Sequence, residues 1–414
     1  MQLYVFGYNG HLQLPNAAPF RKAVYAPKLA FSAETENTKH VKVLWASWSD
    51  LIVAYTREGE VRSRIRHYGK GFNHWEPLWQ GTLPITGFFI RDNLPSFFGK
   101  QLHNGVQGYL TADPPLISFF RAKGRDGAFE CFPLRHSREV LGIRITSADR
   151  VLVSTKRTAR HPDGCVFEVP SLQQLVEGLR HRGNNNVHPH SFEDEVRCEF
   201  APVQWCTNAT TMTALDRQGR VFTYASDGRY PKCLGRPSGD PDAASRIDIA
   251  QPIPYLEHCT VVKIASGGYM SAALSEDGEL FLWGQACPGA KGELNVLKDR
   301  AVSPDDRGRV EKDSNSEAEF VRILDVAIEG RLARVVDVSI GWGHILVAAE
   351  VDKGNGEVAR AVLAAGEGGS GQLGVGSKVP FAEDFVEVEA LRGKKIRDIT
   401  CAGYSSFVVV EEED

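Results

Sequence analysis

The sequence lacks several features that define common protein classes. Its 8 cysteines stand singly, with no CxxC pair, so neither a disulfide framework nor a cysteine-based zinc site is expected. No apolar run reaches the roughly 18 residues of a membrane span, and the first residues carry no signal-peptide pattern. The net charge of -4 lacks the basic excess of a nucleic-acid-binding protein. We therefore expect a cytoplasmic and/or nuclear protein with no membrane partner and no direct nucleic-acid binding.

Motifs of catalysis and cofactor binding are also missing. No G-x-x-x-x-G-K-[ST] or G-x-S-x-G pattern occurs. Residues 366–371 match G-x-G-x-x-G, but the residues after them do not open a helix, as a phosphate loop requires. His181, His188 and His190 lack a zinc-ligand spacing, and His344 is expected to hydrogen-bond to backbone at a blade's inner strand. We expect a non-enzyme with no catalytic residue, no cofactor and no metal site.

One stretch, Val261–Leu294, shows what the chain does contain. Three apolar runs follow one another in it, separated by Gly267-Gly268 and by Asp277-Gly278, and a glycine-rich loop follows the third run. Asp-Gly between apolar runs is a strong hairpin signal, because both central residues of a type I′ turn need positive φ. The stretch is therefore predicted to form a small antiparallel sheet.

The same plan recurs along the chain. Residues 203–235, 335–374 and 41–64 repeat its order of strands and turns, with a spacing of about 59 residues between the two copies that align best. Only the first half of a unit lies at 396–410, and only the second half lies at 3–14. Two half repeats can pair in one blade and leave no strand edge open. The sequence thus predicts an all-β, seven-bladed β-propeller, closed by pairing of its N- and C-terminal half repeats.

The propeller is predicted to occupy residues 1–414 as a single domain. Residues 65–200 contain strand-like runs that do not align with the repeat unit. A short helical insertion is expected near 171–183, because leucines recur there at helical spacing after Pro170. Residues 299–319 are polar and have no apolar period, which indicates a long surface loop.

Three segments resemble repeats of the regulator of chromosome condensation family: FGYNGHLQL (6–14), SGGYMSAALSEDGELFLWG (266–284) and GEGGSGQLG (366–374). The resemblance implies a seven-bladed propeller that acts as a non-catalytic interaction scaffold. One small, propeller-only member has a start similar to residues 6–14 and partners a small zinc protein in diphthamide synthesis and Elongator-dependent modification of tRNA wobble uridine. The resemblance therefore implies an adaptor whose partner is a small zinc-binding protein, as a monomeric propeller within a hetero-complex.

The same resemblance implies two alternative functions. The founding member is a guanine-nucleotide exchange factor for the GTPase Ran. It carries a basic N-terminal tail, whereas this sequence starts with its half repeat at Leu3, so we expect exchange activity less than the adaptor role. A second small member has a stretch similar to Ala46–Ser49 and associates with a chromatin hydroxylase or demethylase, which implies a chromatin-associated partner of a histone-modifying enzyme.

Five residues are weak candidates for partner binding. Arg62, Arg64 and Arg66 alternate and are expected on one face of a strand, as a solvated edge or as a contact for an anionic partner. Trp75 and Trp79 are expected on an exposed loop, and tryptophan is enriched at interface hot spots.

Other tryptophans, among them Trp48, Trp283 and Trp342, recur within the repeats. Packing between neighbouring blades explains them without a ligand. Function is therefore expected where the copies differ, in 65–200 and in the insertions.

Overall fold

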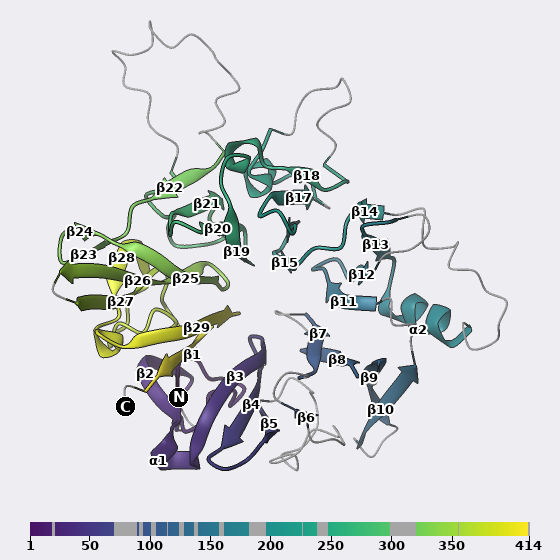
Figure 1. Ribbon diagram of the computed structural model, residues 1–414, viewed down its shortest axis with the longest axis horizontal. Coiled ribbons are helices and arrows are strands. Elements are labelled where there is room, and N and C mark those ends of the chain that lie inside the picture. Colours follow the sequence, from purple (N-terminus) through teal and green to yellow (C-terminus); the bar gives the residue numbers. More distant parts are fainter. Residues whose placement is uncertain are drawn as a thin grey trace, which may run out of the picture.

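The fold is a ring of seven four-stranded antiparallel sheets around a central axis (Figure 1). The computed structural model describes residues 1–18, 21–69, 89–90, 94–100, 105–113, 115–123, 128–135, 140–156, 161–181, 196–225, 227–237, 247–298, 320–354 and 356–412. This arrangement confirms the expected all-β, seven-bladed propeller. Among the described residues, no helix is long and apolar enough to cross a membrane.

Each blade begins with a strand beside the axis and continues outward through three more. Blade 1 consists of β29 (Lys395–Ala402), β30 (Ser405–Glu411), β1 (Gln2–Tyr8) and β2 (Ala23–Phe31). Blade 2 consists of β3 (Thr38–Ala46), β4 (Asp50–Arg57), β5 (Arg62–Gly69) and β6 (Phe89–Ile90). Blade 3 consists of β7 (Ser96–Gly99), β8 (Val106–Ala112), β9 (Pro115–Lys123) and β10 (Ala128–Arg135). Blade 4 consists of β11 (Val140–Ile145), β12 (Val151–Thr155), β13 (Cys165–Val169) and β14 (Val196–Cys198).

The remaining blades follow in chain order. Blade 5 consists of β15 (Gln204–Thr207), β16 (Thr211–Leu215), β17 (Val221–Ala225) and β18 (Gln251–Pro252). Blade 6 consists of β19 (Val261–Gly267), β20 (Met270–Ser275), β21 (Leu280–Gly284) and β22 (Arg322–Leu324). Blade 7 consists of β25 (Arg334–Ile340), β26 (His344–Gly354), β27 (Glu357–Glu367) and β28 (Phe381–Glu387). Outside the blades lie the hairpin β23 (Ala327–Ile328) and β24 (Arg331–Leu332), the helices α1 (Ala33–Glu36) and α2 (Leu172–His181), and the short 3-10 helices Pro231–Leu234, Pro254–Leu256 and Glu389–Leu391.

The two ends of the chain close the ring in blade 1. Strand β1 pairs antiparallel with β30, from Gln2 opposite Val410 to Gly7 opposite Ser405. The terminal ammonium group of Met1 also lies 2.9 Å from a carboxylate oxygen of Glu412. The expected closure by half repeats is therefore confirmed, and both chain ends lie at this blade in Figure 1.

Residues 65–200 contain blades 3 and 4 and part of blade 2, although their sequence does not align with the repeat unit. The turn between β11 and β12 uses Asp149 at a positive φ of 64°, where the best-preserved repeat has glycine. Helix α2 is inserted between β13 and β14 and buries Leu175 and Leu179 against strands of blades 3 and 4. The expected helix near 171–183 falls at α2, whereas the loop at 299–319 lies outside the described residues.

Four glycines form the corner at the end of the third strand in their blades. Gly7, Gly69, Gly284 and Gly366 have φ of 111°, 111°, 111° and 94°. Each pairs with the first residue of the second strand, and a Cβ atom at any of them would lie 2.0–2.4 Å from a backbone oxygen. Only glycine fits this backbone approach and this φ. The shared geometry explains why these glycines recur in the sequence.

Neighbouring blades pack through an aromatic residue placed just before such a corner. Trp283 is fully buried, and its ring lies against Gly235 of blade 5, where a Cβ atom would approach it to 2.9 Å. Phe6 is likewise fully buried against Gly374 of blade 7, where a Cβ atom would approach it to 2.7 Å. The expected role of Trp283 in packing between blades is therefore confirmed.

Polar side chains of the inner strands join each blade to the next. The Gln204 side chain of blade 5 both donates to and accepts from the backbone of Ile264 in blade 6, at 3.0 Å each. Lys263 of blade 6 forms an ion pair with Asp337 of blade 7. Asp337 in turn accepts a hydrogen bond of 2.8 Å from the backbone amide of Ile399 in blade 1. These links run around the axis from blade 5 to blade 1.

His344 connects blades 7 and 1, and it lies on a different strand from the one expected. Its Nε2 lies 3.0 Å from the hydroxyl of Ser406, and this hydroxyl donates to the backbone oxygen of Gln372 at 2.8 Å. Because the Ser406 proton is used there, the Nε2 of His344 must be the donor. This contact is with a side chain, and the neighbouring backbone of Trp342 also acts on the imidazole, in the direction that raises its pKa. His344 begins the second strand of its blade and not the inner one. Burial lowers the pKa of His344 to about 4, so the imidazole is neutral.

Replacement of Gly7 by alanine is expected to lower the free energy of unfolding by about 3 kcal/mol, because it combines a strained φ with overlap on the Tyr404 oxygen. Gly59→Ala is the matched control. Gly59 also has a positive φ, of 76°, but nothing lies within 4 Å of its added Cβ, so a loss of about 1 kcal/mol is expected. Urea unfolding of the two variants measures the difference, and equal losses would contradict this account of the corner.

The neutral state of His344 predicts a pH dependence of stability. The unfolded chain protonates this imidazole below its ordinary pKa of 6.5, whereas the folded chain does so only near 4. The unfolded state therefore binds more protons in this window, and stability is lost as the pH falls from about 6.5 to about 4, by about 3 kcal/mol in total. His344→Gln, which can still donate to Ser406, is expected to lack this part of the loss. Urea midpoints across the window test it, and identical profiles for the two proteins would refute it.

Candidate functional site

The candidate site lies on the face of the propeller that carries the turns after the inner strands, called the turn face below. The loops after the third strands return to the same face, because strands within a blade alternate in direction. Turns of neighbouring blades are hydrogen-bonded to one another. The amide of Ala209 donates to the oxygen of Gly268 at 2.8 Å, and the amide of Trp342 donates to that of Gly403 at 2.7 Å. The turn face is thus held together as a rim around the axis.

Four half-buried aromatic residues from blades 5, 6, 7 and 1 form what we call the aromatic rim: Tyr230, Tyr269, Trp342 and Tyr404. The rings of Tyr230 and Tyr269 have centroids 4.9 Å apart, and those of Tyr269 and Trp342 are 5.9 Å apart at 71°. Burial raises the pKa of Tyr269 to about 12, so its phenol is neutral. Rigid, partly exposed aromatic residues of this kind dominate protein interfaces.

A second aromatic group continues the turn face in blades 1 and 2. The rings of His11 and Trp48 have centroids 4.8 Å apart, and those of Tyr8 and His11 are 5.8 Å apart. Gln13, which is fully buried, fixes this group by donating to the backbone oxygens of Tyr8 and Trp48 at 2.8 Å each. Trp48 and Trp342 therefore contact neighbouring blades, as expected, but also keep part of their surface exposed.

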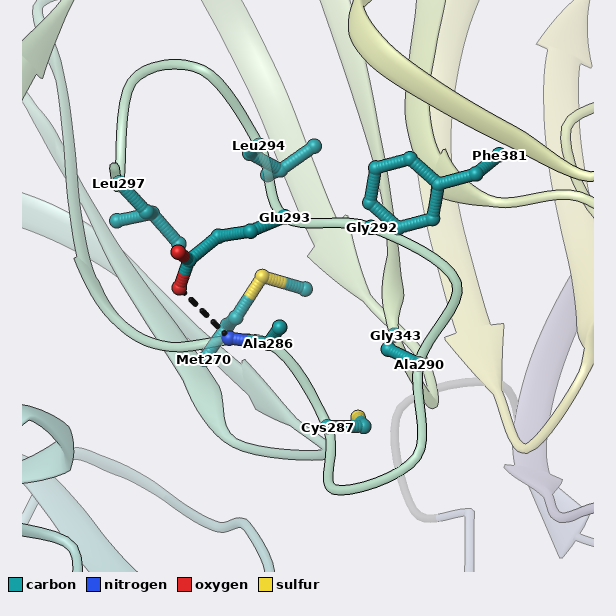
Figure 2. Close-up of a pocket in the computed structure, with 10 residues that line it drawn as sticks. All are labelled: Met270, Ala286, Cys287, Ala290, Gly292, Glu293, Leu294, Leu297, Gly343 and Phe381. Carbon is teal, nitrogen blue, oxygen red and sulfur yellow. Dashed lines mark hydrogen bonds between the residues drawn. The ribbon is translucent and has the colours of Figure 1, made fainter.

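A pocket opens beside the aromatic rim, between the loop after β21 in blade 6 and blade 7 (Figure 2). It is lined by Met270, Ala286, Cys287, Ala290, Gly292, Glu293, Leu294, Leu297, Gly343 and Phe381. It is a shallow opening to solvent that encloses about 10 Å³, about the space of one water molecule. Sites for cofactors and drug-sized ligands are larger, at about 300–1,000 Å³. The pocket is therefore too small for a cofactor or a drug-sized ligand.

Glu293 gives this pocket its charge, and two other blades show what usually stands in its place. The corner loops of blades 1 and 7 carry Gln13 and Gln372 before a leucine, and the side-chain oxygens of these two residues accept the amides of His11 and Ser370. In blade 6 the corresponding residue is Glu293, which accepts the amide of Ala286 at 3.2 Å (Figure 2). No other hydrogen bond or ion pair of Glu293 is found among the described residues.

Two thiols near the aromatic rim, those of Cys233 and Cys287, are poor nucleophiles. Cys287 lines the pocket but is only 6% exposed, and burial raises its pKa to about 12. Burial also raises the pKa of Cys233, beside Tyr269, to about 11. Only a thiolate reacts readily, so both stay inert near neutral pH. No group of three or more His, Cys, Asp or Glu side chains that could hold a metal ion occurs in the described part of the chain.

The three alternating arginines, Arg62, Arg64 and Arg66, lie on β5, the third strand of blade 2. Arg64 is exposed and pairs with Glu60, at 2.6 Å and 3.1 Å. Arg66 is half-buried, donates to the hydroxyl of Tyr55 at 2.9 Å, and lies over the Tyr55 ring at 5.1 Å. Arg62 is exposed at the start of the strand. The three arginines therefore share one strand, but Arg66 is held by aromatic packing within the protein.

Sequence reasoning did not single out Tyr230, Tyr269 or Tyr404 as site residues. A signal was present, because the repeats place an aromatic residue beside glycine in the inner turn, as in Gly268-Tyr269 and Gly403-Tyr404. The candidates Trp75 and Trp79 lie outside the described residues, so their exposure remains an expectation.

At the opposite end of the central axis, a group of exposed side chains is aliphatic rather than aromatic. Leu141, Val203 and Val262, at the starts of the inner strands of blades 4, 5 and 6, are 45%, 57% and 52% exposed. β-bulges at Val140/Gly142 and at Val261/Lys263 turn two of these side chains outward. Each of these aliphatic residues belongs to a different blade.

Comparison with known proteins supports the assignment of the fold. No family model matches the chain. The mitochondrial RCC1 domain-containing protein RUG3 of Arabidopsis thaliana is 27% identical over 230 residues, which are 54% of this chain and 42% of that protein. The human E3 ubiquitin-protein ligase HERC2 is 28% identical over 251 residues, which are 57% of this chain and 4% of HERC2. The chain thus matches less than half the length of these relatives.

A solved structure extends the likeness to the whole chain. The crystal structure of Prp20p from Saccharomyces cerevisiae, described together with its binding to Gsp1p and histones, aligns with a TM-score of 0.58. The alignment covers 100% of this chain and 92% of Prp20p at 13% identity, a level at which the fold alone is shared. The chain therefore folds as an RCC1-like seven-bladed β-propeller, the RCC1 domain being that of the regulator of chromosome condensation.

Proposed function

We propose that the protein is a non-catalytic scaffold that binds a protein partner on the turn face. The aromatic rim is the observation that carries this proposal. Its four rings come from four blades, are held by hydrogen-bonded turns, and remain half-exposed. Binding to such a preorganised surface costs little ordering of side chains. The raised pKa values of Cys233 and Cys287 argue against a reactive thiol beside it.

The partner that we propose is a small zinc-binding protein, in a complex that serves diphthamide synthesis and modification of tRNA wobble uridine. The support is the sequence resemblance of residues 6–14 and of the degenerate repeats to a small propeller-only member of the family. The exposed arginines of β5, together with Trp75 and Trp79, are proposed as secondary contacts. A cytoplasmic and/or nuclear location belongs to the same proposal, although the relative RUG3 is described as mitochondrial.

Guanine-nucleotide exchange on a Ran-type GTPase is the second candidate function. The fold likeness to Prp20p favours it, since the structure of that protein was described with its binding to Gsp1p. The same description includes histones, which supports a third proposal, a chromatin-associated partner of a histone-modifying enzyme. Both are ranked below the adaptor, because a shared fold does not carry a shared function and the sequence resemblance at residues 6–14 points to the small propeller-only member.

Truncation of the aromatic rim is expected to weaken partner binding. Trp342→Ala combined with Tyr404→Ala should raise the Kd for the purified small zinc protein by about 30-fold or more, since a single hot-spot residue already contributes about 2 kcal/mol or more. Isothermal titration calorimetry measures this change. Leu332→Ala is the matched control, because Leu332 is 72% exposed on β24, away from the turn face, and this variant should bind within about twofold of the wild type.

The scaffold proposal also predicts the result of an exchange assay. Release of a fluorescent guanine nucleotide from purified Ran should proceed at its intrinsic rate when this protein is added. Acceleration that the Trp342→Ala and Tyr404→Ala changes abolish would instead assign exchange activity to the turn face. If the wild-type protein forms no complex with the zinc protein at micromolar concentration, the adaptor proposal fails.

A further inference from the structure

We propose that the guanidinium group of Arg144, in blade 4, is a binding site for a carboxylate side chain of a protein partner. This inference rests on the proposed scaffold function and deepens it, since it names a chemical group by which the partner would be recognised. Arg144 is the last residue but one of β11, the inner strand of blade 4, so it lies beside the central axis and close to the turn face (Figure 1).

One edge of the Arg144 guanidinium is free. Its Nη1 donates to the backbone oxygen of Ile143 at 3.2 Å, and no other hydrogen bond or ion pair of Arg144 is found among the described residues. The remaining donors, Nε and Nη2, lie along one edge of the planar group and keep contact with solvent, because the side chain is only half-buried. Two parallel N–H groups on one edge match the two oxygens of a carboxylate.

The charge of Arg144 has no counter-charge in the described part of the chain. Burial lowers the pKa of Arg144, and the thiol of Cys206 opposes this effect. That thiol is itself neutral, because burial raises its pKa to about 11. The ring of Trp205 lies 5.3 Å from the guanidinium carbon and supplies a cation–π contact without a negative charge. A partly desolvated cation in these surroundings favours an anion as its ligand.

A charge at this position is specific to blade 4. Arg144 comes two residues after Gly142, which closes a β-bulge in β11. The corresponding residues of blades 6, 7 and 1 are Ala265, Ser339 and Thr400, and each comes two residues after the same kind of bulge. None of these three side chains is charged. The plan of the propeller therefore does not require a guanidinium here.

Blade 4 also lacks an acceptor that blade 7 provides. Asp337 closes the bulge of blade 7 and accepts the backbone amide of Ile399 in blade 1, at 2.8 Å. In blade 4 this place is taken by Gly142, which has no side chain and lies against the Trp205 ring. Beside the axis, the junction between blades 4 and 5 thus presents the Arg144 guanidinium and no acidic side chain of the kind found between blades 7 and 1.

A carboxylate of a bound protein fits this site better than a phosphate group. One guanidinium balances one negative charge, whereas a phosphate monoester carries a charge of about −1.5 to −2 near neutral pH. The ammonium group of Lys263, farther round the axis, is already paired with Asp337. Ser147, in the turn after β11, donates to the backbone oxygen of Ala209, so this turn belongs to the same rim of turns that carries the aromatic residues. A partner on the turn face would therefore lie within reach of Arg144.

Tryptophan signals provide a direct test. The chain has 7 tryptophans, and labelling with fluorinated tryptophan gives each of them a fluorine NMR signal. Trp205→Phe assigns the signal beside Arg144. Trp283→Phe assigns the reference signal, since Trp283 is fully buried between blades 5 and 6. The full-length protein is titrated with Nα-acetyl-glutamate N-methylamide, with the corresponding uncharged glutamine compound and with methyl phosphate.

The glutamate probe is expected to shift the Trp205 signal saturably, with an affinity about tenfold above that of the glutamine probe, while the Trp283 signal stays in place. Arg144→Gln should abolish this preference. Arg144→Lys keeps the charge but not the two parallel donors, so it should bind the glutamate probe about threefold more weakly than the wild type.

Arg220→Gln is the matched control. Arg220 also lies over an aromatic ring, that of Phe222 at 5.5 Å, but its guanidinium is already paired with Asp216. This variant should therefore keep the preference for the glutamate probe. An unchanged preference in Arg144→Gln, or no response of the Trp205 signal in the wild type, would overturn the proposal. Tighter binding of methyl phosphate would overturn the choice of a carboxylate.

Binding of the purified small zinc protein tests the source of the carboxylate. Arg144→Gln should raise its Kd about tenfold, as expected for the loss of one charged pair at an interface. If Trp205 responds to the glutamate probe but this Kd is unchanged, the site stands as one for small free carboxylates and its assignment to a side chain of this partner fails. If the wild-type protein forms no complex with the zinc protein but Trp205 responds, the adaptor proposal fails and the carboxylate site stands.

Discussion

The structure depends on the pairing of β1 with β30, which joins the two ends of the chain in blade 1. A propeller without this pairing would expose two strand edges, and open edges favour association with other chains. The pairing is antiparallel over Gln2–Gly7 and Ser405–Val410 and ends at the corner of Gly7. Because the ring is closed, the position of every blade is fixed by two neighbours, and contacts between blades can be made all the way round.

Because the ring is closed, the contacts between blades also hold the turn face in place. Polar links such as Lys263 with Asp337, and packing contacts such as Trp283 on Gly235, hold the inner strands in register. The hydrogen bond from Trp342 to Gly403 then joins the turns themselves. A repeat architecture built in this way tolerates a change in one copy, since six other blades maintain the ring. Glu293 in blade 6, where blades 1 and 7 carry glutamine, is such a change, and its carboxylate still accepts a hydrogen bond from the amide of Ala286.

Much of the fold was predictable from sequence because it is encoded locally. Gly284 and Gly7 mark corners that only glycine can occupy, and Asp277-Gly278 marks a hairpin turn, so the repeat and the half repeats could be identified. Blades 3 and 4 could not be aligned, because α2 interrupts one of them and Asp149 replaces a turn glycine. The expectation that function lies in the divergent region differs from the proposed site, which is in the best-preserved repeat and its neighbours.

The sequence by itself determined the number of blades, the way the ring closes and the positions of the corners, because these follow from local turn chemistry and a regular period. It also indicated the absence of recognisable catalytic motifs. Only the tertiary structure decided which side chains share a surface. Tyr230 and Trp342 are far apart in the sequence, yet both contact Tyr269, because each is placed on the same face of a different blade. Likewise, Glu293 and Phe381 line one pocket because blade 6 packs beside blade 7, and no local pattern encodes that contact.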